Sequence, residues 1–437
     1  MPAPWYNRPV TSPGDLVELT VGEPAPGGAC VAREPGGRVV FVRYALPGER
    51  VVAAVTEVRR SFLRADVHDV IEGSPDRVDP PCAVAGPGRC GGCDFQHMSL
   101  SAQRAAKATV VTAQLRRIAG VDVPVVVEAP PPVDGLRWRT RLRFAVAEDG
   151  RVGLRRHRSH DVEPVERCLV AHPLLTEARR SIRSGSRPGA VVVEADPSTG
   201  EATAWAEPAR GPGAARRGAA DQDRSGVTGI GARPLERVSA GRRYRVSPGV
   251  FWQAHVAAPD VLVAAVLDAA RPRPGERVAD LYAGAGLFTV PLAEAVDPGG
   301  TVVAIERSEA ACDDAVHNTT GWGHVTVVRA PVDPVVLARH VGRADVVVLD
   351  PSRKGAGADA VRAIADLEPR VVVSVSCDAA TFARDARVLL DAGWRLEGLR
   401  ALDLFPMTRH VELVGVLRPS APGRGDEVRS PVRGPSR

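Results

Sequence analysis

Residues 278–295 read VADLYAGAGLFTVPLAEA, a short apolar strand that runs into a glycine turn and then into a helical pattern. The predicted strand covers Val278 to Leu281, and Gly284 and Gly286 make the turn. Downstream, strand-like runs (TVVAIERS, ADVVVLDPS, RVVVSVSC) alternate with helix-like runs. This alternation predicts a doubly wound, mainly parallel sheet with helices on both faces.

The glycine turn predicts a ligand held at the start of the helix. Its glycines let the backbone approach a ligand closely, and Glu306, at the end of the next strand, can accept hydrogen bonds from both ribose hydroxyls. A pyrophosphate would require G-x-G-x-x-G, but a bulky residue replaces the third glycine, and Asp280 would repel phosphate. The pattern therefore favours S-adenosylmethionine, a cation, over a dinucleotide or a turn without a ligand.

Polar residues stand at the ends of four predicted strands of this sheet. They are Asp280, Glu306, Asp350 and Cys377. Because open parallel sheets bind ligands outside the carboxyl ends of their strands, we expect these side chains to converge at one edge.

A thiol at that edge suits the transfer of a methyl group to carbon 5 of a pyrimidine. That carbon is a poor nucleophile until a thiolate adds to carbon 6, and a base must later remove the carbon-5 proton so that the thiolate can leave. Cys377 can supply the thiolate, and Glu412, between Val411 and Leu413 in a late strand, can supply the base. Burial would raise the pKa of this carboxyl towards neutrality. A buried structural cysteine and a solvent-facing glutamate are the alternatives.

Composition points to a globular protein with more than one domain. The chain has 437 residues, of which 44% are hydrophobic and 25% charged, so two or three domains are expected. No apolar run approaches the roughly 20 residues that cross a bilayer, and the N-terminus, MPAPWYNRPVTSPGD, lacks the features of a secretory signal. We therefore expect a cytoplasmic protein, monomeric by default, with no membrane partner and with reduced cysteines.

Basic residues are nearly all arginine: two of the 57, Lys107 and Lys354, are lysines, and the net charge is +5. This bias is typical of a GC-rich genome and does not by itself indicate nucleic-acid binding. Two segments say more, since 137–144 (RWRTRLRF) and 151–160 (RVGLRRHRSH) alternate cations with other residues. Alternation on a strand places the cations on one face, where they would contact either phosphates or solvent alone.

The N-terminal half divides into smaller units. Residues 14–70 are short β-rich runs separated by Pro-Gly and Gly-Gly turns, which predict a small β-barrel. The segment 99–118 has a helical pattern, 124–205 predicts a mixed α/β region, and 206–234 contains almost no large apolar side chains.

Three cysteines of the intervening loop, Cys82, Cys90 and Cys93, have C-x7-C-x2-C spacing, and Cys168 could complete a set of four. Four thiolates suit zinc or an iron–sulfur cluster, and spacing alone favours zinc.

Several motifs together resemble the signatures of the 5-methyluridine RNA methyltransferases, class I S-adenosylmethionine enzymes that act on tRNA or ribosomal RNA. The motifs are DLYAGAGLFTVPLA, DPSRKGAG, SVSCDAATFARD, LDLFPMTRHVE and SPGVFWQAHV, and residues 12–70 resemble the family's small OB-like RNA-binding TRAM barrel. Two positions depart from the family pattern: Asp378 and Ala379 follow the thiol in place of Asn-Pro, and His255 replaces an Asn. We expect Asp378 to raise the thiol pKa slightly.

The resemblance assigns roles to residues of this chain. It implies that Cys377 is the nucleophile, that Glu412 is the base, and that the four cysteines hold a [4Fe–4S] cluster in preference to zinc. Its implied cofactor contacts are Gln253, Tyr282, Glu306 and Asp350.

The sequence thus predicts a multi-domain α/β protein. We expect a TRAM barrel at 12–71, a central α/β domain with the cysteine cluster at 76–245 (206–234 being a flexible insertion), a Rossmann-like methyltransferase domain at 246–418, and a disordered tail at 419–437. The predicted partner is RNA, with ribosomal RNA favoured over tRNA. Alternatives are a cytosine-5 RNA methyltransferase, which would carry a second cysteine after Asp350-Pro351, and a non-catalytic TRAM-type RNA-binding protein.

Overall fold

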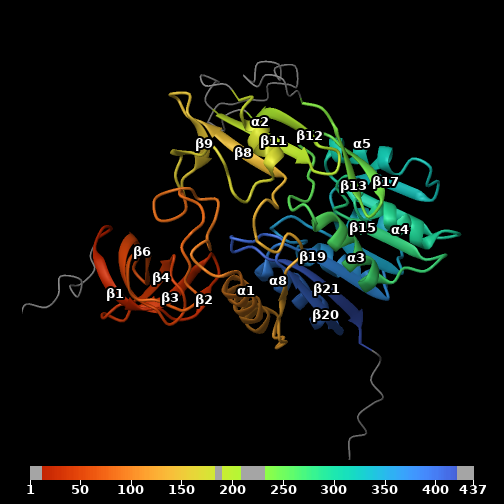
Figure 1. The fold of residues 1–437 in the computed structure, drawn as a ribbon. Helices are drawn as coiled ribbons and strands as arrows, with labels where there is room; N and C mark the ends of the chain where they lie inside the picture. Colours follow the sequence, from red (N-terminus) through yellow and green to blue (C-terminus); the bar gives the residue numbers. More distant parts are fainter. Residues whose placement is uncertain (1–11, 183–188, 208–231, 421–437) are drawn as a thin grey trace, which may run out of the picture.

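The computed structural model describes residues 12–182, 189–207 and 232–420, in three lobes (Figure 1). The N-terminal lobe, red in Figure 1, is a six-stranded sheet with spatial order β1-β5-β6-β4-β3-β2. Its strands are β1 (Leu16–Thr20), β2 (Pro24–Ala25), β3 (Ala29–Arg33), β4 (Val39–Arg43), β5 (Arg50–Val58) and β6 (Phe62–Glu72).

This sheet curls around a single apolar core. Alternate residues such as Val40 and Val42 of β4 are fully buried, as expected for a sheet with one covered face. The amide of Gly22 donates to the carbonyl of Val31 (2.7 Å), and the amide of Val31 donates to the carbonyl of Glu23 (2.9 Å). The chain after β1 is therefore hydrogen-bonded to β3. The predicted β-rich N-terminal domain is confirmed.

The middle lobe is a five-stranded antiparallel sheet with order β10-β9-β8-β11-β12, covered by α2. Its elements are β8 (Arg141–Val146), β9 (Val152–Arg155), β10 (Val162–Pro164), α2 (Pro173–Arg179), β11 (Gly189–Asp196) and β12 (Glu201–Glu207). Cys90 reaches into the core of this lobe, and Cys168 packs against it.

The large lobe is the doubly wound sheet that the strand–helix alternation predicts. Its order is β17-β16-β15-β18-β19-β21-β20-β7, with β15 to β19 parallel and β21 antiparallel to both β19 and β20. The strands are β7 (Val127–Glu128), β15 (Arg277–Leu281), β16 (Thr301–Glu306), β17 (Val325–Arg329), β18 (Val346–Leu349), β19 (Val371–Ser376), β20 (Trp394–Leu402) and β21 (Glu412–Pro419).

Both faces of this sheet are covered, which explains why β18 and β19 are buried at every position. The helices that accompany the sheet are α3 (Ala258–Ala270), α4 (Thr289–Val296), α5 (Glu309–Asn318), α6 (Pro334–His340), α7 (Ala358–Asp366) and α8 (Ala379–Asp391).

The predicted 99–118 helix is α1 (Leu100–Gln114) followed by the π-helical turn η2 (Leu115–Ala119), and Ser99 caps its start. It lies beside α8 between the N-terminal and large lobes (Figure 1), and Val111 and Leu115 are buried in the large lobe's core. Its Lys107 Nζ lies 2.5 Å from Asp403 Oδ1, and both side chains are buried. The helix is therefore part of the large lobe.

The predicted segment 76–245 thus divides between two cores in space, because α1, η2 and β7 join the large lobe. The hairpin of β13 (Leu235–Ser239) and β14 (Arg242–Val246) also contributes Tyr244 and Val246 to that lobe's core. Most of the predicted 206–234 insertion and of the 419–437 tail lies outside the described residues. Within the described ranges, no helix is both long and apolar enough to cross a membrane.

Candidate functional site

The polar strand ends predicted from the sequence meet at one edge of the large sheet. Glu306 ends β16, Asp280 lies one residue from the end of β15, and Asp350 and Cys377 directly follow β18 and β19. Strand register makes them neighbours, since Leu281 pairs with both Ile305 and Leu349, and Leu349 pairs with Ser374. Parallel pairing in this register brings the four carboxyl ends side by side.

The turn after β15 forms an open cradle. Tyr282, Gly284 and Gly286 all have left-handed backbone, with φ of 63°, 57° and 89°. A Cβ placed on Gly284 would meet nothing within 4 Å, so the backbone there faces free space. Glu306 braces the turn, because its Oε2 accepts from the Gly284 amide at 3.1 Å and its Oε1 accepts from the two amides that follow it, both at 2.7 Å.

Two carboxyls beside the cradle, Asp280, which is buried, and Asp350, which is partly buried, form no ion pair within the described residues. Asp280 accepts from Thr289 Oγ1 on Oδ2 (2.5 Å), while its Oδ1 has no hydrogen-bond partner in the part of the chain that is described. Asp350 Oδ2 accepts from Gln253 Nε2 at 3.2 Å. Burial raises the pKa of Asp280 to about 7 and, with the nearby charge of Asp280, also raises the pKa of Asp350. A cationic ligand would stabilise both carboxylates.

Cys377 and Glu412 lie at the adjoining ends of neighbouring strands. In the antiparallel pairing of β19 with β21, Val375 pairs with Val414 and Ser376 with Leu413, where β19 ends. Continuing this register by one position would set Cys377 opposite Glu412, and the charge of Glu412 does act on the Cys377 thiol. Directly opposed residues of such a pair lie on the same face of the sheet. The sequence-predicted thiol and carboxyl are therefore brought together.

Charges around this pair act in opposite directions. Burial, together with the Glu412 and Asp350 carboxyls, raises the pKa of the Cys377 thiol to about 11, although the Arg353 guanidinium lowers it in part. Burial also raises the pKa of Glu412 well above its usual range, with a further contribution from Asp350. A carboxyl whose pKa is raised is a stronger base when ionised than an ordinary carboxylate, which suits it to remove a proton.

Asp378, one of the departures from the family pattern, has a structural role. Its Oδ1 accepts from the amides of Ala380 (3.1 Å) and Thr381 (2.9 Å) and caps α8. The charges that act most on the thiol are those of Glu412, Arg353 and Asp350. The expected effect of Asp378 on the thiol is thus smaller than theirs.

His255, the other departure, is buried and stacks on Trp138 with ring centroids 5.5 Å apart. Its Nδ1 accepts from the Ala257 amide at 3.1 Å, and burial lowers its pKa to about 4. The ring is therefore neutral and serves to join the middle lobe to the Gln253 segment.

Cys377 opens into a pocket of about 180 Å³ that three parts of the chain enclose. The N-terminal lobe supplies residues 24–30, α1 supplies Lys107 and Val111, and the large lobe supplies residues 377–380 and 409–411. The cysteine pocket is thus completed by a domain distant in sequence.

A wider cleft of about 1130 Å³ adjoins this pocket and runs between the three lobes. Arg353, Arg409 and His410 line both cavities, so they mark the place where the cleft meets the pocket. The cleft is rich in cations and aromatic rings: Arg43, Arg64, Arg139, Arg158, Arg353, Arg409, Phe41, Trp138 and Phe405. Such a surface fits the phosphates and exposed bases of a single-stranded nucleic acid.

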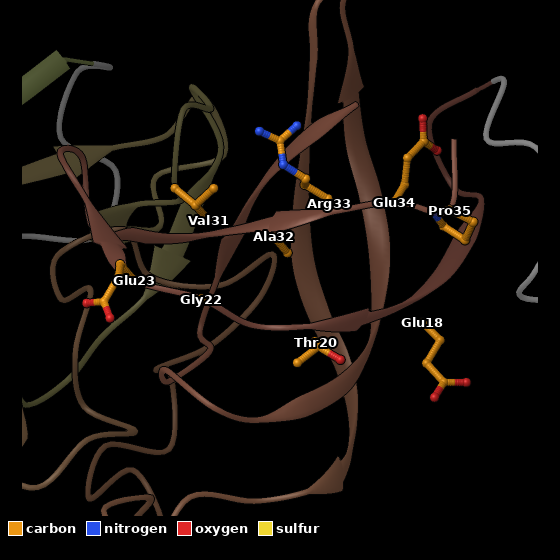
Figure 2. A pocket seen from close by; sticks show the side chains of 9 residues that line it. All are labelled: Glu18, Thr20, Gly22, Glu23, Val31, Ala32, Arg33, Glu34 and Pro35. Carbon is orange, nitrogen blue, oxygen red and sulfur yellow. The ribbon is translucent and has the colours of Figure 1, made fainter. Parts of the chain in front are cut away.

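A second hollow on the N-terminal lobe has the opposite charge (Figure 2). It measures about 770 Å³ and carries the carboxylates of Glu18, Glu23 and Glu34 with one cation, Arg33. Carboxylates repel phosphate, so this side of the lobe is unsuited to a polyanion.

The cations predicted on alternate positions of 137–144 divide between two roles. Arg141 and Arg143 of β8 pair with Glu194 of β11 (2.9 Å) and Glu207 of β12 (2.6 Å). Arg139 instead lines the cleft and lies over the Trp138 ring at 5.7 Å. The alternation therefore marks an ion-paired strand, with one arginine available to a ligand.

The four predicted cysteine ligands gather between the middle and large lobes. Charges on Cys82 and Cys168 both act on Cys90, and charges on Cys168 and Cys90 act on Cys93. All seven cysteines of the chain are free. Across the described ranges, no three His, Cys, Asp or Glu side chains are arranged closely enough to hold a metal ion as they stand.

Burial raises the pKa values of Cys90, Cys93 and Cys168, and backbone amides near Cys90 and Cys168 partly oppose that effect. The amide of Gly92 hydrogen-bonds to Cys90, and the amides of Val170 and Ala171 hydrogen-bond to Cys168. Donors directed at sulfur stabilise a ligated thiolate more than a thiol. Burial, with smaller contributions from neighbouring charges, raises the pKa of Cys90 to about 11, so a bound metal would have to hold the deprotonated form.

The sequence predictions missed Arg353, Arg409 and Asp94, which the structure places around the two cavities. Arg353 follows the Asp350-Pro351 turn and could have been found as a cation at a strand end. Asp94 and Arg409 have no comparable signal, because their meeting depends on tertiary contacts far apart in sequence.

Comparison with known proteins agrees with this architecture. A model of the TRAM domain matches residues 11–68. An RNA methyltransferase of Streptomyces coelicolor is 42% identical over 95% of this chain and 96% of its own length. The 23S rRNA (uracil(1939)-C(5))-methyltransferase RlmD of Chromohalobacter salexigens is 34% identical over 94% of this chain and 91% of its own length.

Among solved structures, this chain is similar to the tRNA (uracil-54, C5)-methyltransferase of Pyrococcus abyssi, determined with S-adenosyl-L-homocysteine. The TM-score is 0.66 at 24% identity, with 91% of this chain and 99% of the other covered. At that identity the likeness shows a shared fold across all three lobes.

Proposed function

We propose that this chain, which belongs to the RNA methyltransferase family that includes RlmD, methylates carbon 5 of a uracil in RNA. The observation that carries the proposal is that the Cys377 thiol lies close enough to Glu412 for the charge of this carboxyl to act on it, beside the carboxyls of Asp280 and Asp350. The relatives of 34% and 30% identity that act on 23S rRNA favour ribosomal RNA as the substrate over tRNA.

The acidic cradle would hold S-adenosylmethionine, which supplies an activated methyl group when bound. Glu306 can accept from ribose hydroxyls, while Asp280 and Asp350 offer negative charge to the amine and sulfonium. Gln253 and Tyr282 would complete the cofactor contacts. The cradle is acidic, whereas the cleft is lined by arginines, so the cationic cofactor and the anionic RNA are attracted to different places.

Cys377 and Glu412 would carry the chemistry on the base. The thiolate adds to carbon 6 of uracil and makes carbon 5 nucleophilic, so that carbon 5 accepts the methyl group. Glu412, as a carboxylate, then removes the proton from carbon 5. The carbon–sulfur bond breaks, the double bond between carbons 5 and 6 is restored, and Cys377 leaves as a thiolate. Arg353 assists by favouring the thiolate.

We also propose that Cys82, Cys90, Cys93 and Cys168 hold a [4Fe–4S] cluster, with zinc as the alternative occupant. The amides directed at Cys90 and Cys168 support this assignment. Such a cluster would stabilise the junction between the middle lobe and the cleft. Anaerobic purification should give a brown protein with about four irons per chain, and a colourless protein containing zinc would refute the cluster.

The reaction is tested with unmodified 23S rRNA fragments and cofactor carrying a labelled methyl group. Nuclease digestion should yield labelled 5-methyluridine, and 5-methylcytidine as the sole product would establish cytosine as the substrate. RNA containing 5-fluorouridine should trap a covalent adduct, because fluorine cannot be removed as a proton. Cys377→Ala should abolish the adduct. Cys312 is a free thiol that lines neither cavity, so Cys312→Ala should retain the adduct. If no methyl group were transferred to any RNA, the alternative of a non-catalytic RNA-binding protein would be favoured.

A further inference from the structure

Asp94 occupies the junction of all three lobes, although it takes no part in the proposed chemistry. It directly follows Cys93 in the cysteine loop and is 7% exposed. Its Oδ1 lies 3.5 Å from Arg409 Nη1 of the large lobe and 3.9 Å from Arg43 Nη2 of the N-terminal lobe. One carboxylate thus pairs with cations from two other parts of the chain.

Backbone contacts join the same partners. Asp94 Oδ2 accepts from the amide of Arg409 at 3.3 Å, and the amides of Asp94 and Phe95 both donate to the carbonyl of Met407, at 2.9 and 3.0 Å. The segment 407–410 is therefore held against the cysteine loop. Glu412 begins its strand two residues after that segment, so the contacts act close to the proposed base.

The N-terminal lobe packs on this junction through Gly28. A Cβ on Gly28 would lie 3.3 Å from the Cβ atoms of both Arg409 and Asp94, closer than most real contacts allow. Gly28 lies in the turn between β2 and β3, and residues 24–30 form a wall of the Cys377 pocket. The turn can occupy this position because Gly28 has only a hydrogen as its side chain and tolerates a φ of +81°.

We propose that Asp94 is a positioning residue for methyl transfer: it holds Arg409 and the Gly28 turn of the N-terminal lobe against the Cys377 pocket. The N-terminal lobe is then a structural part of the site that receives the target base, in addition to any affinity it has for RNA. This inference rests on the proposed uracil methylation. The geometry of the Cys377 pocket would then depend on Asp94 in the cysteine loop. Asp94 would act through the side chain of Arg409.

The first test measures adduct formation with saturating 5-fluorouridine RNA. Asp94→Asn keeps the size of the side chain and removes its charge, and we expect adduct formation to slow by about 10-fold, the lower end for loss of a charge-assisted contact. The affinity for S-adenosylmethionine should stay unchanged, because Asp94 lies outside the acidic cradle. Arg409→Gln should slow the reaction similarly, and the double variant should be no slower than Arg409→Gln alone. Asp94→Glu should restore part of the rate.

A matched glycine pair tests the packing independently. Gly28→Ala and Gly37→Ala both place a side chain on left-handed backbone, at φ of +81° and +85°, but nothing lies within 4 Å of a Cβ on Gly37. Adduct formation should slow by several-fold in Gly28→Ala and stay near the wild-type rate in Gly37→Ala. If Asp94→Asn fails to fold, this pair alone decides the proposal.

Several outcomes would overturn the inference. Asp94 lines the cationic cleft, so if it merely repelled RNA, Asp94→Asn would form the adduct faster than wild type at RNA concentrations below saturation and at the same rate at saturation. Equal rates for wild type and Asp94→Asn, or for the two glycine variants, would also overturn it. If wild type itself formed no adduct, the proposed methylation would fail, and that result is distinct from all the others.

Discussion

Replacing Glu412 with glutamine should separate the two halves of the proposed reaction. Continuing the register of β19 and β21 by one position would set Cys377 opposite Glu412, and the Cβ atoms of directly opposed residues are about 5 Å apart. Two negative charges at that distance, with an effective dielectric constant of about 20, repel by on the order of 3 kcal/mol. Glutamine keeps the shape and removes the charge, so at a pH where Glu412 is ionised the thiolate should form up to about 100-fold more readily.

Release of the product should change in the opposite direction. Glutamine cannot take the proton from carbon 5, and a positioned base typically contributes about 10² to 10⁴ in rate. We therefore expect Glu412→Gln to attach RNA to Cys377 and to accept the methyl group, but to turn over at least about 100-fold more slowly than wild type. A methylated covalent complex should accumulate with ordinary uridine.

A single-turnover experiment with labelled RNA and a labelled methyl group measures both steps. After denaturation, both labels should appear on the protein band of Glu412→Gln, and the Cys377→Ala/Glu412→Gln double variant should show neither. Normal turnover by Glu412→Gln would place the base elsewhere. An adduct that forms more slowly than in wild type would show that Glu412 orients the thiol and does not oppose its ionisation.

Three further predictions concern cofactor binding and stability. Burial raises the pKa of Asp280 to about 7, above the unfolded value of about 4. Its contribution to stability is therefore lost as the pH rises between these values. The gain in melting temperature from S-adenosylmethionine should grow from pH 5 to pH 8, and Asp280→Asn should lose part of this pH dependence, because the pKa of Asp350 is raised as well. Gly415→Ala puts a Cβ 2.4 Å from the buried ring of Phe382 and should lower the free energy of unfolding, measured by chemical denaturation, by about 1–3 kcal/mol. Gly398→Ala is the control, because the nearest atom to its Cβ lies 3.8 Å away, and it should leave that free energy unchanged. Lys107→Met should cost about 3–5 kcal/mol by leaving Asp403 buried and unpaired, and Lys107→Met/Asp403→Leu should recover much of that loss.

The sequence predicted the parts of the site that depend on strand order alone. Each of Asp280, Glu306, Asp350 and Cys377 stands at the end of an apolar run, and parallel strands bring such ends to one edge whatever the side chains elsewhere do. Glu412 was predictable for a related reason, because a carboxyl between apolar neighbours implies a buried strand position.

Other features depend on contacts between distant segments and had no local signal. The helix α1 has ordinary amphipathic spacing, and nothing in it indicates that Lys107 pairs with Asp403, which lies beyond the whole middle lobe in sequence. The alternating arginines indicated a strand face that contacts either phosphates or solvent, yet β11 and β12 supply carboxylates to Arg141 and Arg143. Partner choice of this kind is decided by tertiary packing.

The arrangement of charge explains how one small site could receive two ligands of opposite sign. Asp280, which is buried, and Asp350, which is partly buried, lie where we propose that the cofactor binds, and burial of their negative charge without a cation costs stability. Arg353 and Arg409 stand on the RNA side, where the cleft meets the cysteine pocket. Both groups of charges act on Cys377: Asp350 opposes ionisation of the thiol, whereas Arg353 favours it. A cofactor that neutralised Asp350 would remove one of the charges opposing the thiolate, so the nucleophile should become more reactive once the methyl donor is in place.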